Sequence, residues 1–332
     1  QIVYHSNLDG LAWVEVDGIK YYDEYAGIIK SETSHHNVAV PMEALDKAGS
    51  YTVCFSPVEK REPYHPKSGA TVKQTYNFRP VDFSDGVQIY SVADSHSNTE
   101  LCSKAAAYHG DKLDLLVLCG DILSESTSLQ KMYDIAITAS NITKGERPVI
   151  YARGNHEGRG ADFDKLYDMF PTSTGQFYYT FRQGPAAFVV LDAGEDKPDS
   201  HHEYGGTADY DAYRQVQTQW LQNAVKEESF ASAPMKICII HIPTLAFRSS
   251  WYAERWVTEH WVPILEKAGI DLALCAHHHK WRVVPAGEHG KNYPLLINAN
   301  NERMDVVVTP KSIDVKTYST DGTLVHQWNK NK

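Results

Sequence analysis

Residues 149–160 of this 332-residue chain read VIYARGNHEGRG. The run at 149–151 is short and apolar, as is typical of a strand. Asn155 and His156 follow it closely, and this polar pair is poorly suited to packing in a core. An asparagine carbonyl can bind a metal ion, and a histidine can bind one or transfer a proton. The stretch therefore predicts a strand that delivers metal-binding or catalytic groups at its C-terminal end.

Four further segments repeat this arrangement. Each is a short apolar run, which reads as a strand buried on both faces, and each is followed at once by polar residues. The polar residues at these four strand ends are Asp94 with His96, Asp121, His241, and His277 with His279. In open α/β folds, residues just beyond the C-terminal ends of such strands line the binding crevice. The sequence therefore predicts that several strand ends converge on one site.

The first 84 residues follow a different pattern. They contain short alternating segments separated by Gly, Pro, Asp and Ser, which is typical of a small β-sandwich of the fibronectin or immunoglobulin kind. From about residue 87 strands and helices alternate, which favours an α/β arrangement of central sheets flanked by helices. We therefore expect an all-β domain at 1–84 and a catalytic domain at 85–332.

Within the second domain, the apolar periodicity predicts individual elements. Strands are expected near 88–92, 114–119, 148–152, 177–182, 186–192, 236–240 and 271–275. Helices are expected near 99–110, 126–140, 161–169, 209–228 and 254–268. After residue 281 the pattern is mostly β.

The composition is that of an ordinary globular protein, with 42% hydrophobic and 22% charged residues. The net charge of −10 argues against a partner that is a nucleic-acid polymer, since such binding needs a basic face. No apolar run approaches the roughly 20 residues of a transmembrane segment. The five cysteines form no Cys-x-x-Cys pair and are expected to be buried free thiols. They are Cys54, Cys102, Cys119, Cys238 and Cys275.

The groups at the strand ends are hard oxygens and imidazoles, with no thiolate. This set suits catalytic Fe, Mn or Zn better than a cysteine-rich structural zinc site. Asp121 has two carboxylate oxygens and can bridge two ions, while His277 and His279 can each face a different ion. Two metal ions about 3.5–4 Å apart form a clamp for displacement at phosphorus. The remaining task is to protonate the leaving oxygen, and His156 is the candidate general acid.

For the charged residues around these motifs, the sequence allows both a role in substrate binding and a purely structural role. Arg153 and Arg159 flank the loop of His156 and could bind phosphate with two hydrogen bonds each, although surface ion pairs would explain them as well. His278 could contact substrate or point away from the site. Glu157 is expected to orient a neighbouring group.

The ordered motifs resemble those of the calcineurin-like metallophosphoesterase superfamily over about residues 87–300. The motifs are Asp-x-His at 94–96, Gly-Asp at 120–121, Gly-Asn-His-Glu at 154–157, His241, and His-x-His at 277–279. An all-β domain ahead of such a domain resembles the purple acid phosphatase arrangement. The resemblance implies a sandwich of two mixed β-sheets flanked by helices and a centre of two divalent or trivalent metal ions.

Carried over by position, the resemblance also implies the ligands. One metal ion would be held by Asp94, His96, Asp121 and His279. The other would be held by Asp121, Asn155, His241 and His277. A hydroxide bridging the two ions would attack phosphorus, with Asp121 and His156 as the catalytic side chains and His156 as the acid.

Three positions depart from the family patterns. Purple acid phosphatases carry a tyrosine where this chain has Ser124, so the colour that a tyrosine gives to iron is not expected. The last motif usually opens with glycine, and here it opens with Ala276. A second histidine of the purple enzymes is replaced by Trp251.

The sequence therefore predicts a phosphoesterase that hydrolyses a small phosphorylated substrate, preferably a monoester. One alternative is a phosphodiesterase acting on cyclic nucleotides or other small diesters. Another is an inactive metal-binding scaffold or a glycan-binding surface protein. The chain opens at Gln1 and shows no signal peptide, and the segment at 194–221 resembles exported bacterial members of the superfamily. We expect an extracellular or periplasmic protein, with a lipid anchor at a bacterial surface as one form of this expectation. The pattern does not indicate an oligomeric state.

Overall fold

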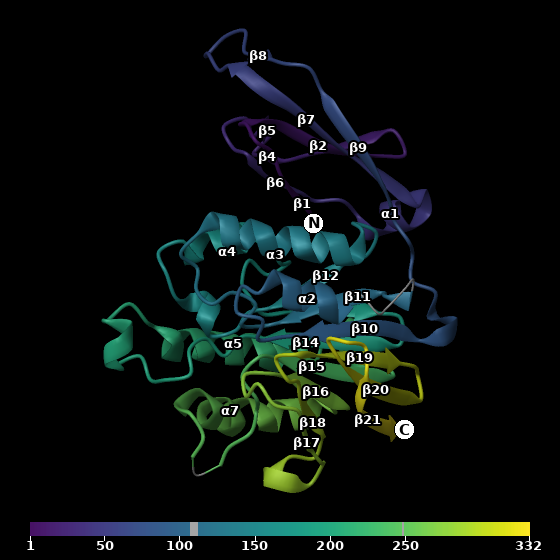
Figure 1. Cartoon of the computed structure of the whole chain (residues 1–332), viewed down its shortest axis with the longest axis vertical. Helices are drawn as coiled ribbons and strands as arrows, with labels where there is room; N and C mark the ends of the chain where they lie inside the picture. The colour runs from purple at the N-terminus through teal and green to yellow at the C-terminus, as the bar shows by residue number, and fades with distance from the viewer. Residues whose placement is uncertain (107–111, 248) are drawn as a thin grey trace.

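The computed structural model describes residues 1–106, 112–247 and 249–332. Its larger part contains two six-stranded mixed β-sheets (Figure 1). The first sheet has the order β12-β11-β10-β19-β20-β21 and the second β13-β14-β15-β16-β18-β17. Strands β10, β11 and β12 are parallel, as are β14, β15, β16 and β18. The expected pair of mixed sheets flanked by helices is confirmed.

The strands of the first sheet are β10 (Val87–Val92), β11 (Leu115–Cys119), β12 (Val149–Ala152), β19 (Glu302–Val308), β20 (Ser312–Ser319) and β21 (Leu324–Asn331). Those of the second are β13 (Tyr179–Gln183), β14 (Ala186–Leu191), β15 (Met235–Ile240), β16 (Leu272–Cys275), β17 (Arg282–Val284) and β18 (Leu295–Ile297). All seven strands predicted from the sequence between residues 88 and 275 are present, with ends shifted by no more than two residues.

Both faces of the parallel strands are covered, which explains their continuous apolar sequences. Ile89 and Val117 of the first sheet pack against Phe188 and Ile239 of the second, in the layer between the sheets. The opposite face of the first sheet packs on α2 (Thr99–Ala106), α3 (Leu129–Thr143) and α4 (Leu166–Met169). The outer face of the second sheet packs on α5 (Tyr210–Ala224), α6 (Glu228–Ala231) and α7 (Tyr252–Ala268).

The helices differ from the prediction in small ways. The helix expected at 209–228 ends at Ala224, and the short α6 follows it as a separate turn. In the segment 161–169, the 3-10 helix η4 (Phe163–Lys165) leads into α4. Part of the helix expected at 99–110 falls on residues 107–110, which lie outside the described residues. Further 3-10 helices among the described residues after β10 are η3 (His156–Gly158), η5 (His202–Tyr204) and η6 (Glu288–Gly290).

The N-terminal part is rich in strands, as expected, and most of them are short. Its larger sheet has the order β3-β2-β7-β8, with β9 also paired to β7, while β1 pairs with β6 and β4 with β5. The strands are β1 (Ile2–His5), β2 (Gly10–Val16), β3 (Ile19–Tyr22), β4 (Glu24–Tyr25), β5 (Ile28–Ile29), β6 (His35–Val38), β7 (Ser50–Lys60), β8 (Lys67–Ser68) and β9 (Val72–Asn77). A short helix, α1 (Met42–Ala48), was not predicted.

This N-terminal part lies over α3 (Figure 1). The ring of His5 stacks on that of Tyr133 with centroids 4.0 Å apart, and the Tyr51 hydroxyl donates to the carbonyl oxygen of Gly145 at 2.6 Å. The chain then passes through the 3-10 helix η1 (Phe83–Asp85) before β10 begins. The expected domain boundary between residues 84 and 85 falls within η1.

All five cysteines are buried free thiols, as the sequence predicted. Among the residues that the structure describes, no helix has both the length and the apolar character needed to cross a membrane.

Candidate metal centre

The polar residues predicted to converge lie at the C-terminal ends of parallel strands from both sheets. Asp94, Asp121 and Asn155 follow β10, β11 and β12, while His241 follows β15 and the segment 277–279 follows β16. Parallel strands present their carboxyl ends at one edge of a sheet, and the two sheets place these edges together. The fold therefore supplies ligands to one site from five separate loops.

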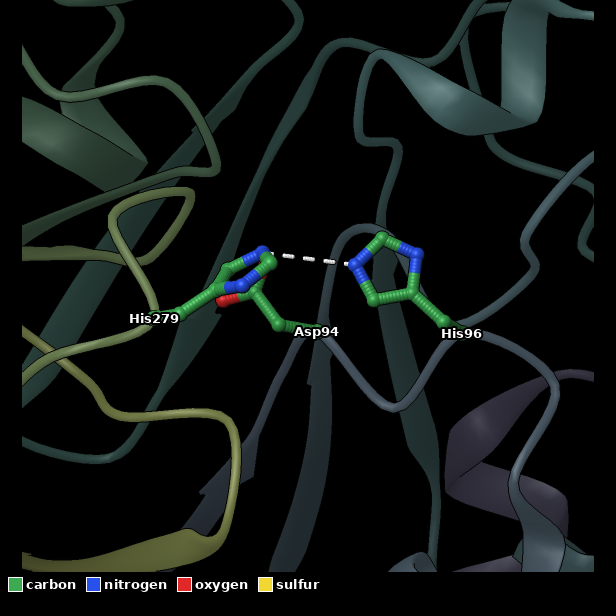
Figure 2. A group of neighbouring side chains, drawn as sticks. All are labelled: Asp94, His96 and His279. Carbon is green, nitrogen blue, oxygen red and sulfur yellow. Dashed lines mark hydrogen bonds and ion pairs between the residues drawn. The ribbon is translucent and has the colours of Figure 1, made fainter.

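Asp94, His96 and His279 form the first group of side chains (Figure 2). Their candidate ligand atoms lie within 4.8 Å of one another. The Nε2 atom of His279 is 3.3 Å from Nε2 of His96 and 3.3 Å from Oδ1 of Asp94. Two imidazoles and a carboxylate that face one point in this way can bind one cation.

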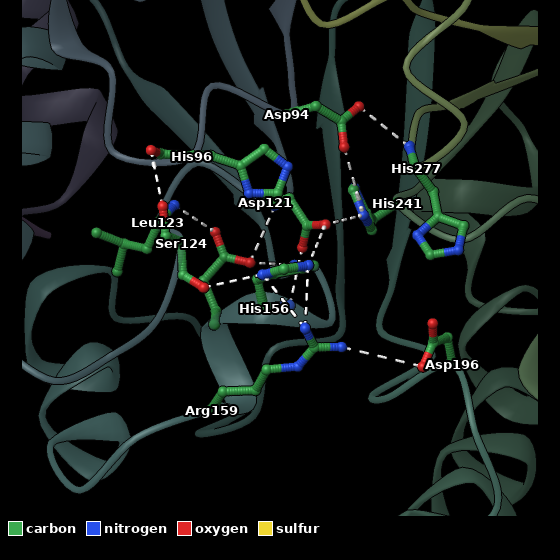
Figure 3. A network of polar contacts seen from close by, with 12 residues as sticks. Asp94, His96, Asp121, Leu123, Ser124, His156, Arg159, Asp196, His241 and His277 are labelled. Carbon is green, nitrogen blue, oxygen red and sulfur yellow. Dashed lines mark hydrogen bonds and ion pairs between the residues drawn. The ribbon is translucent and has the colours of Figure 1, made fainter. Parts of the chain in front are cut away.

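Asp121, His241 and His277 form the second group, by the same 4.8 Å measure. Oδ2 of Asp121 is 3.1 Å from Nε2 of His241 (Figure 3). Asp121 also forms a group with His96 and His156. Because it neighbours ligands of both groups, its carboxylate is placed to bridge two cations.

Oδ1 of Asn155 is buried at the centre and has no hydrogen-bond partner among the described residues, while Oδ1 of Asp94 and Nε2 of His241 contact only other candidate ligands. The residues that carry them are at most 2% exposed. Such atoms are nearly always paired, because each buried unpaired group costs about 1–3 kcal/mol. A metal ion would satisfy the Asn155 oxygen and use the neighbouring donors, and these oxygen and imidazole donors suit Fe, Mn or Zn. The residues therefore fit a two-metal centre.

Backbone conformation supports a functional role for these loops. Five of the seven candidate ligands have a positive φ, a region that side chains other than glycine rarely occupy. They are Asp94 (53°), His96 (46°), Asp121 (49°), His277 (73°) and His279 (57°). Such residues cost about 1–3 kcal/mol each and cluster at functional sites.

The glycines of the two central motifs are required by close packing. A Cβ at Gly120 would overlap the ring of His241, and one at Gly154 would overlap Oδ1 and the backbone nitrogen of Asp121. Gly120 also has a φ of 79°. Glycine therefore lets the loops of β11 and β12 approach each other and the ligand His241.

Glu157 is fully buried and holds the Asp121 loop. Its Oε2 accepts hydrogen bonds from the backbone nitrogens of Asp121 (3.0 Å) and Gly154 (2.9 Å). Its Oε1 accepts from Ile122 (2.7 Å) and Leu123 (3.1 Å). Burial, together with the charge of Asp121, raises the pKa of the Glu157 carboxyl, while these N–H groups act in the opposite direction. Glu157 therefore orients the Asp121 loop, as expected, by accepting hydrogen bonds from four backbone N–H groups.

His156 lies beside this centre with its ring orientation fixed (Figure 3). Nδ1 is 2.9 Å from the carbonyl oxygen of Ser124, which can only accept, so Nδ1 carries hydrogen. Nε2 lies 3.9 Å from Oδ2 of Asp121 and 3.1 Å from a terminal nitrogen of Arg159. The ring therefore presents Nε2 to the space next to the candidate metal ligands.

Ser124, which occupies the position of the purple enzymes' tyrosine, supports this geometry. Its hydroxyl donates to the carbonyl oxygen of His96 at 2.8 Å, and its own carbonyl accepts a hydrogen bond from His156.

The other two positions that depart from the family patterns are also accommodated by the fold. Ala276 has a negative φ, so its methyl group adds no backbone strain. Trp251 is half-exposed at the start of α7, with the Lys197 ammonium 5.2 Å from its ring centroid.

The two arginines have different settings. Arg159 is held by Glu195 through two hydrogen bonds of 2.7 and 2.8 Å, and it still reaches the ring of His156. Arg153 is only 5% exposed, and its guanidinium pairs with Asp192 at 2.6 Å among aromatic rings. Because its charge is already buried and neutralised, we do not retain Arg153 as a phosphate ligand.

His278 also differs from the sequence-based expectation of a substrate contact. Its Nε2 lies 2.5 Å from Oε1 of Glu254, a buried residue in the first turn of α7. The side chain is therefore engaged by the protein, and we do not retain it as a substrate ligand.

The charges of the ligands link metal binding to pH. Burial alone would lower the pKa of His241, but the carboxylates of Asp121 and Asp94 raise it well above its usual value. Burial lowers the pKa of His277 to about 2, so that imidazole is already neutral. Without metal, His241 is therefore protonated at neutral pH and must lose its proton to become a ligand.

We expect Mn²⁺ binding by metal-free protein to release at least one proton. Because the raised pKa of His241 favours its protonated form near neutral pH, the apparent dissociation constant should fall as the pH rises, by about tenfold per pH unit while one proton is displaced. Calorimetric titrations in buffers of different ionisation enthalpy would count the protons released. An affinity that does not change with pH would contradict this protonation state.

The fold is a two-sheet α/β arrangement, and its strand ends carry a candidate centre for two metal ions. Residues 88–281 match the family model for the calcineurin-like phosphoesterases, and the chain belongs to this family. No curated protein matches the chain.

Solved structures with a similar fold include two with low sequence identity. The structure of PhoD is 12% identical, with a TM-score of 0.55, and the alignment covers 98% of this chain and 84% of PhoD. GAP50, the anchor in the inner membrane complex of Plasmodium, is 14% identical with a TM-score of 0.54, covering 75% of this chain and 89% of GAP50. At such identities the similarity concerns the fold alone.

Proposed function

We propose that this protein hydrolyses phosphate esters at a centre of two metal ions, with small phosphomonoesters as its preferred substrates. The observation that carries the proposal is the position of Asp121. Its carboxylate lies between a group of ligands that includes His96 and one that includes His241, with His156 beside it. A shared carboxylate between two ligand groups is the arrangement needed to place two cations on one phosphoryl group.

When bound, the two ions would lower the pKa of a water molecule and neutralise phosphoryl oxygens. The first ion would be held by Asp94, His96, Asp121 and His279, and the second by Asp121, Asn155, His241 and His277. The protein's own residues then have to deliver a proton to the departing alkoxide. His156 supports that role because its Nδ1 is fixed on Ser124 while Nε2, beside the Arg159 guanidinium, faces the candidate ligands and can exchange a proton with the substrate.

Arg159 supports phosphate binding at the same place. Its guanidinium is 32% exposed and held by Glu195, so it is oriented without being fully enclosed. A terminal nitrogen beside Nε2 of His156 can donate to a phosphoryl oxygen as the leaving group departs. A monoester has one more anionic oxygen than a diester, and this favours the monoester beside a guanidinium.

Comparing two chromogenic substrates tests the proposal. Protein loaded with Mn²⁺ should hydrolyse p-nitrophenyl phosphate with a higher kcat/KM than bis(p-nitrophenyl) phosphate, and metal-free protein should hydrolyse neither. A preference for the diester would replace the monoesterase with the phosphodiesterase alternative. Inactivity of the loaded protein on both esters would favour the metal-binding scaffold.

Replacing the proposed acid should affect poor leaving groups most. We expect His156→Ala to lower kcat by about 10²–10⁴-fold on an alkyl phosphate, because the alkoxide leaves only with a proton. The loss should be much smaller on p-nitrophenyl phosphate, whose phenolate leaves without one. Rates for a series of phenyl and alkyl esters would show the difference as a steeper dependence on leaving-group pKa. An equal loss on every ester would contradict the acid role.

A further inference from the structure

Glu254 is a buried carboxylate that joins helix α7 to the last candidate ligand loop. It lies in the first turn of α7 and is 2% exposed. Its Oε2 accepts a hydrogen bond from the backbone nitrogen of Trp251 at 2.9 Å, and its Oε1 lies 2.5 Å from Nε2 of His278. Removing a carboxylate from water is costly unless it is paired, and here both oxygens are paired.

The loop that Glu254 holds is strained and carries two candidate ligands. His278 stands between His277 and His279, whose φ angles are 73° and 57°. The backbone nitrogen of His278 donates to the carbonyl oxygen of Ala276 at 2.8 Å, which makes the turn tight. Such a turn needs external contacts to persist, because both conformations are unfavourable for histidine.

Hydrogen bonds from the rest of the site to the backbone of this loop hold its beginning, while the His279 side chain contacts only other candidate ligands among the described residues. The nitrogen of Ala276 donates to the carbonyl of His241, and that of His277 donates to Oδ2 of Asp94 at 3.1 Å. The bond from His278 to Glu254 anchors the next residue along the chain, immediately before His279. Hydrogen bonds to an ionised group are about twice as strong as neutral ones, so this contact is a substantial restraint.

We propose that Glu254 is a positioning residue which, through His278, holds His277 and His279 ready to bind metal. Partners of this kind behind the ligands typically contribute 10–100-fold to metal affinity. The inference rests on the metal centre of the proposed function but does not depend on phosphatase activity.

The test is the affinity of metal-free protein for Mn²⁺, measured by calorimetry. Glu254→Leu and His278→Ala each remove the contact and should raise the dissociation constant by about 10–100-fold. The double variant should be no weaker than either single one, since both lose the same interaction. The matched control is Glu259→Leu, which removes an exposed carboxylate from the same helix and should bind Mn²⁺ like the unchanged protein.

A conservative variant separates positioning from charge. The amide of Glu254→Gln can accept from the Trp251 nitrogen and donate to a neutral His278 ring, so this variant should recover most of the affinity lost in Glu254→Leu. Equal Mn²⁺ affinity for Glu254→Leu and Glu259→Leu would overturn the proposal. So would effects of the two single variants that add in the double variant. A lower melting temperature of metal-free Glu254→Leu with unchanged affinity would also overturn it, by showing a purely structural contact.

Because the readout is binding of Mn²⁺ alone, the result does not depend on turnover. If the unchanged protein hydrolyses no ester but Glu254→Leu still loses Mn²⁺ affinity, the proposed function fails and the positioning role stands. If the unchanged protein hydrolyses esters and Glu254→Leu binds Mn²⁺ as tightly as it does, the proposed function stands and the positioning role fails.

Discussion

Asp121→Ala is expected to abolish hydrolysis, with kcat falling by at least about 10³-fold. Several kcal/mol of charge stabilisation depend on a correctly placed pair of metal ions, and each 1.36 kcal/mol corresponds to about tenfold in rate. Asp121 is the carboxylate that neighbours both ligand groups, and its Oδ1 also accepts from the backbone nitrogen of His156 at 2.9 Å. The variant should therefore lose the bridging ligand and a restraint on the acid.

Two comparisons make this result specific. Asp121→Asn keeps the acceptor for the His156 nitrogen but lacks the negative charge, so it should lose metal and activity nearly as completely. Asp114→Ala removes a carboxylate beside the opposite end of the same strand, where it accepts from the Gln88 nitrogen. It should retain bound metal and turnover even if the protein is less stable. Hydrolysis of p-nitrophenyl phosphate by Asp121→Ala at the unchanged rate would contradict the two-metal centre.

Glu157→Gln is expected to lower the free energy of unfolding by about 2–6 kcal/mol. The glutamate accepts from four backbone nitrogens, two on each oxygen, in a fully buried position. A glutamine amide keeps one acceptor oxygen and turns its NH₂ group toward two N–H groups, each of which then costs about 1–3 kcal/mol. Urea unfolding of metal-free protein measures the change without contributions from bound ions.

Glu125→Gln is the matched control for this measurement. Glu125 forms an exposed ion pair with Lys131, and surface pairs of this kind contribute about 0–1 kcal/mol. If Glu157→Gln unfolds at the same urea concentration as Glu125→Gln, the hydrogen bonds from the Asp121 loop to Glu157 do not contribute to stability.

The convergence of the candidate ligands could be predicted from the sequence, because each of them follows a strand with a recognisable apolar run. The run before Asp121 is apolar at every position and the run before Asp94 is mostly apolar, as expected of strands covered on both faces, and their carboxyl ends meet at the edges of the sheets. The short helix α1 also had a readable signal, since Pro41 precedes it and Gly49 follows it with a left-handed φ of 65°.

The partners of the charged residues could not be predicted, because they come from distant parts of the chain. Arg153 neighbours the ligand Asn155 in sequence, but its guanidinium turns toward Asp192, which follows β14 in the second sheet. Glu254 and His278 are 24 residues apart, and nothing in either segment indicates that α7 lies against the loop after β16. Such pairings depend on how helices and loops pack around the sheets, which local periodicity does not encode.

The number of metal ions that accompanies activity tests the central claim most directly. Metal-free protein would be titrated with Mn²⁺ while bound metal and hydrolysis of p-nitrophenyl phosphate are followed in the same samples. We predict two ions per chain at saturation, with full activity reached only as the second ion binds. Full activity with one bound ion, or hydrolysis without any bound metal, would contradict a centre in which Asp121 bridges two ions.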